Sequence, residues 1–139
     1  MIQDGVLFMD IKANYPDLNA FLKAAGIGIT LCGISENSFE LTYNPGALLP
    51  NITLKLHKRG FVSNYVPFKY EVQGMSSFMF SLANFFSALP EGVEVNKDNH
   101  KLAIIPSKLK VFKNFNGKCH FKHFDIHYDR IEIGIGVDS

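Results

Sequence analysis

The sequence has 139 residues, only two cysteines, no tryptophan, and none of the short motifs that mark common cofactor sites. Cys32 and Cys119 lie far apart and form no CxxC pair, which favours reduced structural thiols over a disulfide framework or a zinc site. The segment 26–29 (GIGI) lacks both the third glycine of a dinucleotide-binding loop and the lysine of a P-loop. No Gly-x-Ser-x-Gly elbow is present. We therefore expect no cofactor, and no motif nominates a catalytic residue.

The first residues also lack a targeting signal. No basic stretch followed by an apolar run is present there, so nothing indicates a signal peptide, and a cytoplasmic location is the default expectation. The length suits one domain over residues 1–139 with a real hydrophobic core.

Charge is missing altogether from Val72–Pro90. A membrane-spanning helix needs about 20 predominantly apolar residues, and here Gln, Gly, Ser and Asn interrupt the run. We predict instead a helix over Ser76–Leu89 that is apolar almost all the way round. Such a helix must be covered by a sheet or by a second subunit, so it should be the most buried element.

The rest of the chain is dominated by strand patterns. One further helix is expected after Pro16 and Asp17, with its apolar face at Leu18, Phe21, Leu22 and Ala25 and its end at Gly26. The predicted strands are Gly5–Ala13, Ile27–Ile34, Ser38–Tyr43, Ile52–His57, Tyr65–Val72, Val93–Val95, Leu102–Ile105, Lys108–Phe115, Lys118–Tyr128 and Ile131–Val137.

Two turns organise the last forty residues. Asn116-Gly117 between alternating segments predicts a two-residue hairpin turn, and Asp129-Arg130 predicts a second one. A two-residue turn fixes the register of the two strands that it joins. The expected cross-strand pairs are Tyr128 with Ile131, Ile126 with Ile133 and Phe124 with Ile135.

The other face of this meander should carry the polar residues His123, Asp125, His127 and Glu132 with Gly134 and Gly136. The two glycines would leave a shallow trough there. Because alternate strand residues are about 6.6 Å apart, His123 and His127 are too distant to share one metal ion. Solvent-facing histidines are the favoured interpretation, and an enzyme or metal site at His123, Asp125 and His127 is a minor alternative.

Acidic residues are absent from two windows, between Glu40 and Glu71 and between Asp98 and Asp125, and ten of the 14 basic residues lie in these windows. Such clustering attracts phosphates or anionic head groups, although solvated strand faces give the same pattern. In the second window, lysines alternate with phenylalanines around the predicted hairpin tip. Arginine is scarce and no RNA-binding signature is present, so nucleic acid is an unlikely partner.

A faint repeat with a period of 61 aligns Leu41 with Leu102, Pro45 with Pro106, and residues 69–72 with 130–133. The expected fold is α+β: a curved, largely antiparallel sheet around one or two helices, with two repeated helix-plus-meander halves as one option.

The leading functional hypothesis is a non-enzymatic binding module for an apolar or amphipathic, lipid-like ligand. The predicted cavity lining is Met75, Phe78, Met79, Leu82, Phe85 and Phe86, and the predicted contacts to an anionic group or membrane surface are Lys110, Lys113, Lys118 and Lys122. The alternative is a protein-interaction or homo-oligomerisation domain, in which a partner such as a second copy of the chain covers the same helix or the glycine trough.

Overall fold

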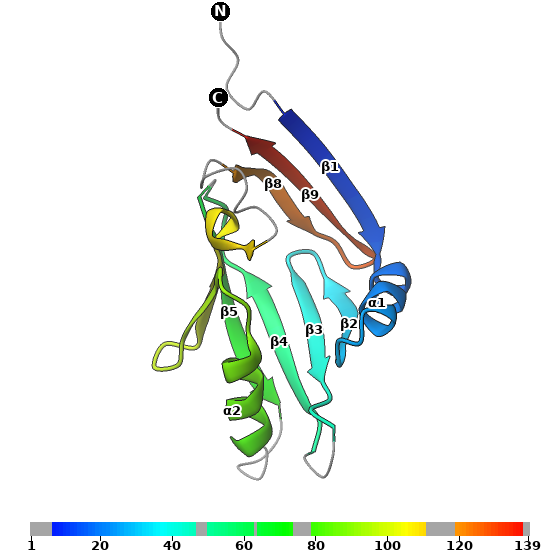
Figure 1. The fold of residues 1–139 in the computed structure, drawn as a ribbon, viewed down its shortest axis with the longest axis vertical. Coiled ribbons are helices and arrows are strands. Elements are labelled where there is room, and N and C mark those ends of the chain that lie inside the picture. The colour runs from blue at the N-terminus through cyan, green and yellow to red at the C-terminus, as the bar shows by residue number, and fades with distance from the viewer. Residues whose placement is uncertain (1–6, 47–49, 63, 74–78, 111–118, 138–139) are drawn as a thin grey trace, which may run out of the picture.

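The computed structural model describes residues 7–46, 50–62, 64–73, 79–110 and 119–137, which form two open antiparallel sheets and two α-helices (Figure 1). The α+β class expected from the sequence is therefore confirmed. In chain order the elements are β1 (Leu7–Asn14), α1 (Tyr15–Ala24), β2 (Ile29–Ser35), β3 (Ser38–Tyr43), β4 (Ile52–Lys58), β5 (Val66–Gln73), α2 (Met79–Ala88), β6 (Val93–Asn96), β7 (Lys101–Ile104), the 3-10 helix η2 (Pro106–Lys108), β8 (Cys119–Ile126) and β9 (Arg130–Val137).

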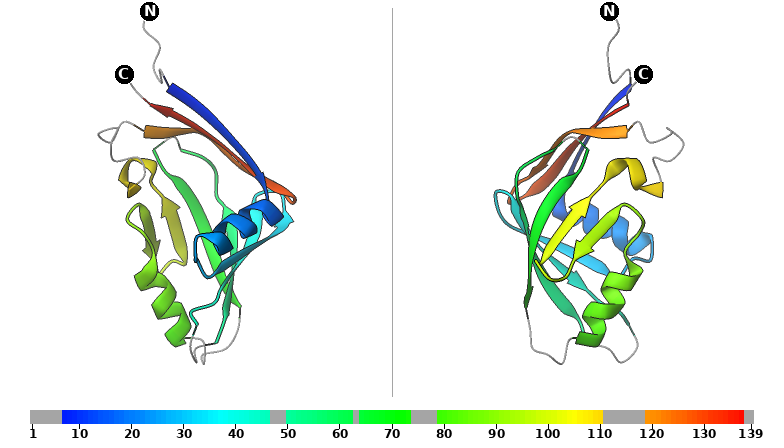
Figure 2. Two further views of the ribbon diagram at one scale, coloured as in Figure 1. Left: turned by 45° about the vertical axis from the view of Figure 1, so that its right-hand side comes forward. Right: turned by 90° about the vertical axis from the view of Figure 1, so that its left-hand side faces the viewer.

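The larger sheet has the strand order β2-β3-β4-β5-β7-β6, and the smaller sheet has the order β1-β9-β8. Figure 2 shows the β6–β7 hairpin turning away from the wall formed by β2 to β5, with α2 below it. The smaller sheet lies across one end of this wall, and α1 lies beside β2 (Figures 1 and 2).

Strict alternation in the central strands builds the core. In β4, Ile52, Leu54 and Leu56 are buried while the residues between them are partly exposed, as expected for a strand with one face inward. Val66, Phe68 and Tyr70 repeat this pattern in β5. The inner face of the larger sheet is thus apolar, and its outer face carries polar and charged side chains.

Helix α1 begins and ends as its sequence predicts. The Asn14 side chain accepts a hydrogen bond from the Asp17 backbone N–H at 2.8 Å, and Gly26 follows the helix with a φ of +74°. The apolar face of α1 is only partly buried, because Leu18 packs against the core whereas Phe21 is 67% exposed.

Helix α2 is much less buried than the sequence predicted, over the side chains that the structure describes. Over residues 82–88, Phe85 is buried while two alanines, Asn84 and Ser87 are exposed. One stripe of the helix packs on the larger sheet: Phe85 contacts Tyr43 and Phe86 contacts Tyr70, with ring centroids 5.2 and 5.7 Å apart. The expectation of a nearly fully covered helix was wrong because Ser, Asn and Ala form an uncharged face that water can solvate. No helix in the described part of the chain is long and apolar enough to cross a membrane.

The C-terminal hairpin forms, but its register differs from the prediction by two residues. Ile126 pairs with Ile131, and Phe124 with Ile133. The turn residues are Tyr128 and Asp129, since the His127 N–H donates to the Arg130 carbonyl at 2.9 Å. A two-residue shift keeps the side chains from His123 to Ile126 on their predicted faces, because side-chain direction repeats every two residues. A register irregularity between Phe121 and His123 then brings Phe121 opposite Ile135, onto the buried face and not the opposite face that the alternation predicts.

Two other features of this region were not foreseen. β1 pairs along the free edge of β9, from Leu7 opposite Val137 to Asn14 opposite Arg130. The predicted strand Lys108–Phe115 is wrong at its start, where Pro106–Lys108 forms a 3-10 helix begun by a proline with fixed φ. The Asn116-Gly117 turn lies outside the described residues.

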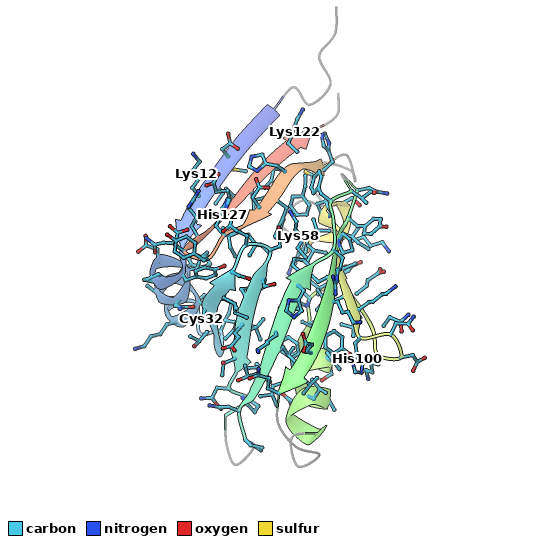
Figure 3. The ribbon with its side chains drawn as sticks, turned by 180° about the vertical axis from the view of Figure 1, so that it is seen from behind. Lys12, Cys32, Lys58, His100, Lys122 and His127 are labelled. Atoms are coloured by element: carbon cyan, nitrogen blue, oxygen red, sulfur yellow. The ribbon has the colours of Figure 1, made fainter. Side chains whose placement is uncertain are left out.

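Backbone carbonyls near the end of β8 join the two sheets. The Tyr15 hydroxyl donates to the His127 carbonyl at 2.9 Å, and the Asn37 N–H donates to the Ile126 carbonyl at 2.8 Å. The Lys58 ammonium group donates to the Phe124 carbonyl at 2.6 Å. Figure 3 shows Lys58 and His127 at this junction.

The order of elements repeats, since a helix precedes four strands in each half, but α1 and α2 start at residues 15 and 79, and β5 and β9 at residues 66 and 130, which is 64 residues apart and not 61. The strand pairing does not repeat between the two halves. β2 to β5 form one continuous meander, whereas β6 and β7 extend that sheet and β8 and β9 join β1 in the other. The two halves therefore resemble each other in element order and differ in how their strands assemble.

Candidate functional site

A groove of about 710 Å³ lies along β5, β7 and β6, and its volume is that of a small-molecule site. Its lining comes from those three strands and from the β4–β5 connection. The lining residues are Arg59, Tyr65, Pro67, Phe68, Lys69, Glu94, Val95, Asn96, Lys101, Leu102 and Ala103.

Strand register concentrates positive charge in this groove. Lys69 of β5 lies directly opposite Lys101 of β7, which lies opposite Asn96 of β6. Directly opposed residues in an antiparallel pair share a face and have Cβ atoms about 5 Å apart, so like charges there destabilise the sheet. Neither lysine has an ion-pair partner within the described residues. An anion bound between them would relieve this repulsion.

Arg59 adds a third cation at one end of the groove. Gly60 follows it with a φ of +86°, and the Arg59 N–H donates to the Pro67 carbonyl at 2.9 Å, which fixes the residue beside β5. Among the described lining residues there is one carboxylate, that of Glu94, and it is paired with Lys108 at 2.9 Å. The groove therefore keeps a positive balance.

The β4–β5 connection also presents apolar surface beside these cations. Phe61, Val62 and Tyr65 are 39%, 40% and 38% exposed. The Tyr65 N–H donates to the Val62 carbonyl at 3.0 Å, so the chain turns tightly there, and Tyr65 itself lines the groove. Cationic and apolar groups thus lie side by side, as an amphipathic ligand requires.

Three of the residues predicted to line an apolar cavity pack in or against the hydrophobic core. Phe85 is buried in the core, and Leu82 and Phe86 pack against that core from α2. Phe86 also borders a smaller hollow of about 320 Å³ between α2 and β6, where the Lys97 ammonium lies 5.4 Å from its ring centroid. Met75 and Phe78 lie outside the described residues, and Met79 begins α2.

Two of the four predicted contacts for an anionic group lie outside the groove. Lys113 and Lys118 lie outside the described residues, and Lys110 and Lys122 are exposed but do not line the 710 Å³ groove. Figure 3 places Lys122 on the smaller sheet, well away from His100 at the β6–β7 turn.

The predicted glycine trough is filled by side chains of the same chain. A Cβ at Gly134 would lie 2.5 Å from the His123 ring, and one at Gly136 would lie 2.6 Å from Lys122 Cε. His123 crosses β9 to reach β1, where its Nε2 is 2.8 Å from Asp10. Its Nδ1 is 3.0 Å from Asp125 without hydrogen-bond geometry. The hydrogen bond with Asp10 is the main reason the His123 pKa is raised, with Asp125 adding to it.

His127 lies between two carboxylates. Its Nδ1 bonds to Glu36 at 2.6 Å, and Glu132 is 3.8 Å from its Nε2. The hydrogen bond from His127 is the largest cause that lowers the pKa of Glu36. Among the described residues, no three His, Cys, Asp or Glu side chains are arranged to hold a metal ion. His123 and His127 instead each join neighbouring elements, His123 through Asp10 and His127 through Glu36.

Comparison of the chain with protein-family models, curated proteins and solved structures finds no match. The groove must therefore be interpreted from its own chemistry.

The sequence held part of the signal for this groove. Arg59 and Lys69 come from the first acid-free window and Lys101 from the second, so the charge pattern marked all three cations. It could not show that β7 inserts beside β5 and brings Lys101 to Lys69. β5 and β7 are separated in the sequence by α2 and β6, and local patterns do not encode a pairing between such distant segments.

Proposed function

We propose that this chain is a binding module for a small amphipathic ligand with an anionic head group, held in the β5–β7–β6 groove. The observation that carries the proposal is Lys69 directly opposite Lys101, with Arg59 beside them, in a 710 Å³ groove. Two opposed lysines cost stability in the free protein, and a bound phosphate or carboxylate offsets that cost.

The head group would lie between Lys69, Lys101 and Arg59, and the apolar tail would follow Tyr65 toward Phe61. Single exposed charge pairs contribute about 0.2–1 kcal/mol, so three cations support modest affinity that weakens as salt rises. The two free cysteines, one of them exposed, suit a reducing, cytoplasmic setting for this function.

Isothermal titration with octyl phosphate, inorganic phosphate and octanol separates the contributions of head and tail. We expect octyl phosphate to bind most tightly, and Lys69→Gln or Lys101→Gln to weaken it by about 2- to 5-fold each. Lys23→Gln, which removes an exposed cation from α1, is the matched control and should leave binding unchanged. Equal binding of octanol and octyl phosphate, or equal losses in all three variants, would refute a cationic head-group site.

The ligand could be free or part of a membrane, and vesicles distinguish these sources. Co-sedimentation with phosphatidylcholine vesicles containing phosphatidylserine, compared with pure phosphatidylcholine, tests an anionic membrane surface. Binding to octyl phosphate without binding to either vesicle identifies a free amphipath.

Homo-oligomerisation is a second candidate function, favoured by β1. This strand is an edge of the smaller sheet, and its alternate residues Met9 and Ile11 are 47% and 40% exposed. An exposed apolar edge strand can pair with a second copy. Light scattering during gel filtration should show a dimer that Ile11→Lys disrupts if this candidate is correct, and a monomer otherwise.

A further inference from the structure

A hydroxyl, an imidazole and a carboxylate form a hydrogen-bonded chain on the outer face of the larger sheet. Ser38 Oγ is 2.7 Å from His57 Nδ1, and His57 Nε2 is 2.6 Å from Glu71 Oε2. The three residues come from β3, β4 and β5, which are adjacent, and Ser38 and His57 are directly opposed in the strand register.

The chemistry of the partners determines the direction of these hydrogen bonds. The ionised Glu71 carboxylate only accepts, so His57 Nε2 carries the proton. In neutral imidazole the other nitrogen is then an acceptor, so the Ser38 hydroxyl donates to His57 Nδ1. A serine that donates to a histidine, itself held by a carboxylate, is the arrangement of an activated nucleophile.

We propose that Ser38 is a nucleophile that accepts acyl groups from esters, with His57 as its general base and Glu71 as the group that orients His57. Ser38 Oγ attacks the ester carbonyl carbon and forms a C–O bond, while its proton moves to His57 Nδ1. The tetrahedral intermediate then releases the alcohol, which takes that proton, and leaves the acyl group on Ser38. Water attacks the acyl carbon with His57 again as base, which frees the carboxylic acid and restores Ser38.

The surroundings set the expected speed. β3 and β4 are interior strands with neighbours on both sides, so their backbone N–H groups serve strand pairing rather than an oxyanion. On the same face, Lys55 of β4 lies between two carboxylates. It is directly opposite Glu40 of β3 and directly opposite Glu71 of β5. Loss of one oxyanion donor costs about 10²- to 10³-fold in other enzymes. We therefore expect slow turnover and an acyl-enzyme that accumulates.

The groove suggests which esters react best. Lys69 is the strand partner of His57 on the side away from Ser38, so its backbone is two strands, about 10 Å, from that of Ser38. An acyl chain ending in a carboxylate could place its charge at Lys69 and Lys101 and its ester at Ser38. This preference, unlike the nucleophile itself, rests on the proposed function of the groove.

Intact-mass and peptide mass spectrometry after reaction with p-nitrophenyl acetate tests the nucleophile. We expect one acetyl group on Ser38, no labelling at this position in Ser38→Ala, and about 100-fold slower labelling of Ser38 in His57→Gln. Thr42→Ala removes another hydroxyl of the outer face, one that lies 3.2 Å from Thr53 Oγ1, and should not change the rate. Acetylation of lysines only, or labelling of Ser38 at an unchanged rate in His57→Gln, would overturn the proposal.

Mono-p-nitrophenyl suberate, which carries a carboxylate at the far end of its acyl chain, tests the substrate preference. Lys69→Gln and Lys101→Gln should slow acylation by this ester several-fold more than they slow acylation by the acetate. If Ser38 reacts equally with both esters in all variants, the nucleophile stands and the groove has no part in it. If neither ester labels Ser38, the nucleophile is refuted, while octyl phosphate titration still decides the groove.

Discussion

Gly33→Ala is the substitution with the clearest expected effect on the junction between the two sheets. A Cβ at this position would overlap the Tyr128 carbonyl oxygen and lie 2.7 Å from both the Tyr128 carbonyl carbon and Tyr15 Cε2. No side-chain rotation can relieve a clash with backbone, so the β8–β9 turn must move away from β2. That movement strains the bond from the Tyr15 hydroxyl to the His127 carbonyl and the one from the Tyr128 N–H to Glu36.

The magnitude follows from these contacts. Overpacking costs about 1–3 kcal/mol, and each weakened hydrogen bond adds up to about 1 kcal/mol. We therefore expect Gly33→Ala to lower the free energy of unfolding by about 3 kcal/mol, which is roughly 10 °C in Tm for a chain of this size.

Gly46→Ala is the matched control, because a Cβ there meets nothing within 4 Å and only the φ of +79° opposes it. That variant should lose about 1 kcal/mol. Urea unfolding followed by far-UV circular dichroism measures both. A loss in Gly33→Ala no larger than that in Gly46→Ala would refute the close docking of the β8–β9 turn on β2.

Three further predictions concern single side chains. Tyr15→Phe removes one partly buried hydrogen bond and should lower the free energy of unfolding by about 1 kcal/mol in the same urea assay. No loss would contradict the hydrogen bond from the Tyr15 hydroxyl to the His127 carbonyl. Phe85→Ala should lower the free energy of unfolding by about 3–5 kcal/mol in that assay, because the side chain is 3% exposed. Ala83→Ser, on the exposed face of α2, is the control and should be neutral. A loss under 1 kcal/mol in Phe85→Ala would mean that Phe85 is not a core residue. His123 has a raised pKa in the folded protein, so its contribution is fully present below about pH 6.5 and is lost as pH rises through the folded value. Urea unfolding at pH 5.5 and 8.5 should show a smaller pH difference in His123→Gln than in the natural chain, and an unchanged difference would contradict the pairing with Asp10.

Local patterns predicted most elements of this fold. The alternation in β3, β4 and β5 acts over a few residues, and so do the proline, aspartate and glycine signals of α1. Such signals can be recognised without knowledge of the tertiary structure. The hairpin register was wrong because the turn falls at Tyr128-Asp129, a choice that depends on contacts of Tyr128 with Glu36 and Gly33 of the other sheet.

The candidate sites were harder to predict because they depend on pairings between distant segments. The absence of charge in α2 indicated burial, but Ser87, the two alanines and the asparagine are solvated, and the Tyr43 hydroxyl donates to Asn84. Ser38, His57 and Glu71 carry no local motif, since three strands bring them together. Only the acid-free windows hinted at the groove.

The most direct test of the groove is chemical-shift mapping with octyl phosphate on ¹⁵N-labelled protein. The proposed function predicts the largest amide shifts at Lys69, Lys101 and Arg59, with shifts that diminish as salt is added. Shifts centred instead on Leu82–Leu89 would place the ligand at α2, as the sequence predicted, and not in the groove. No shift at millimolar ligand would contradict the binding proposal outright.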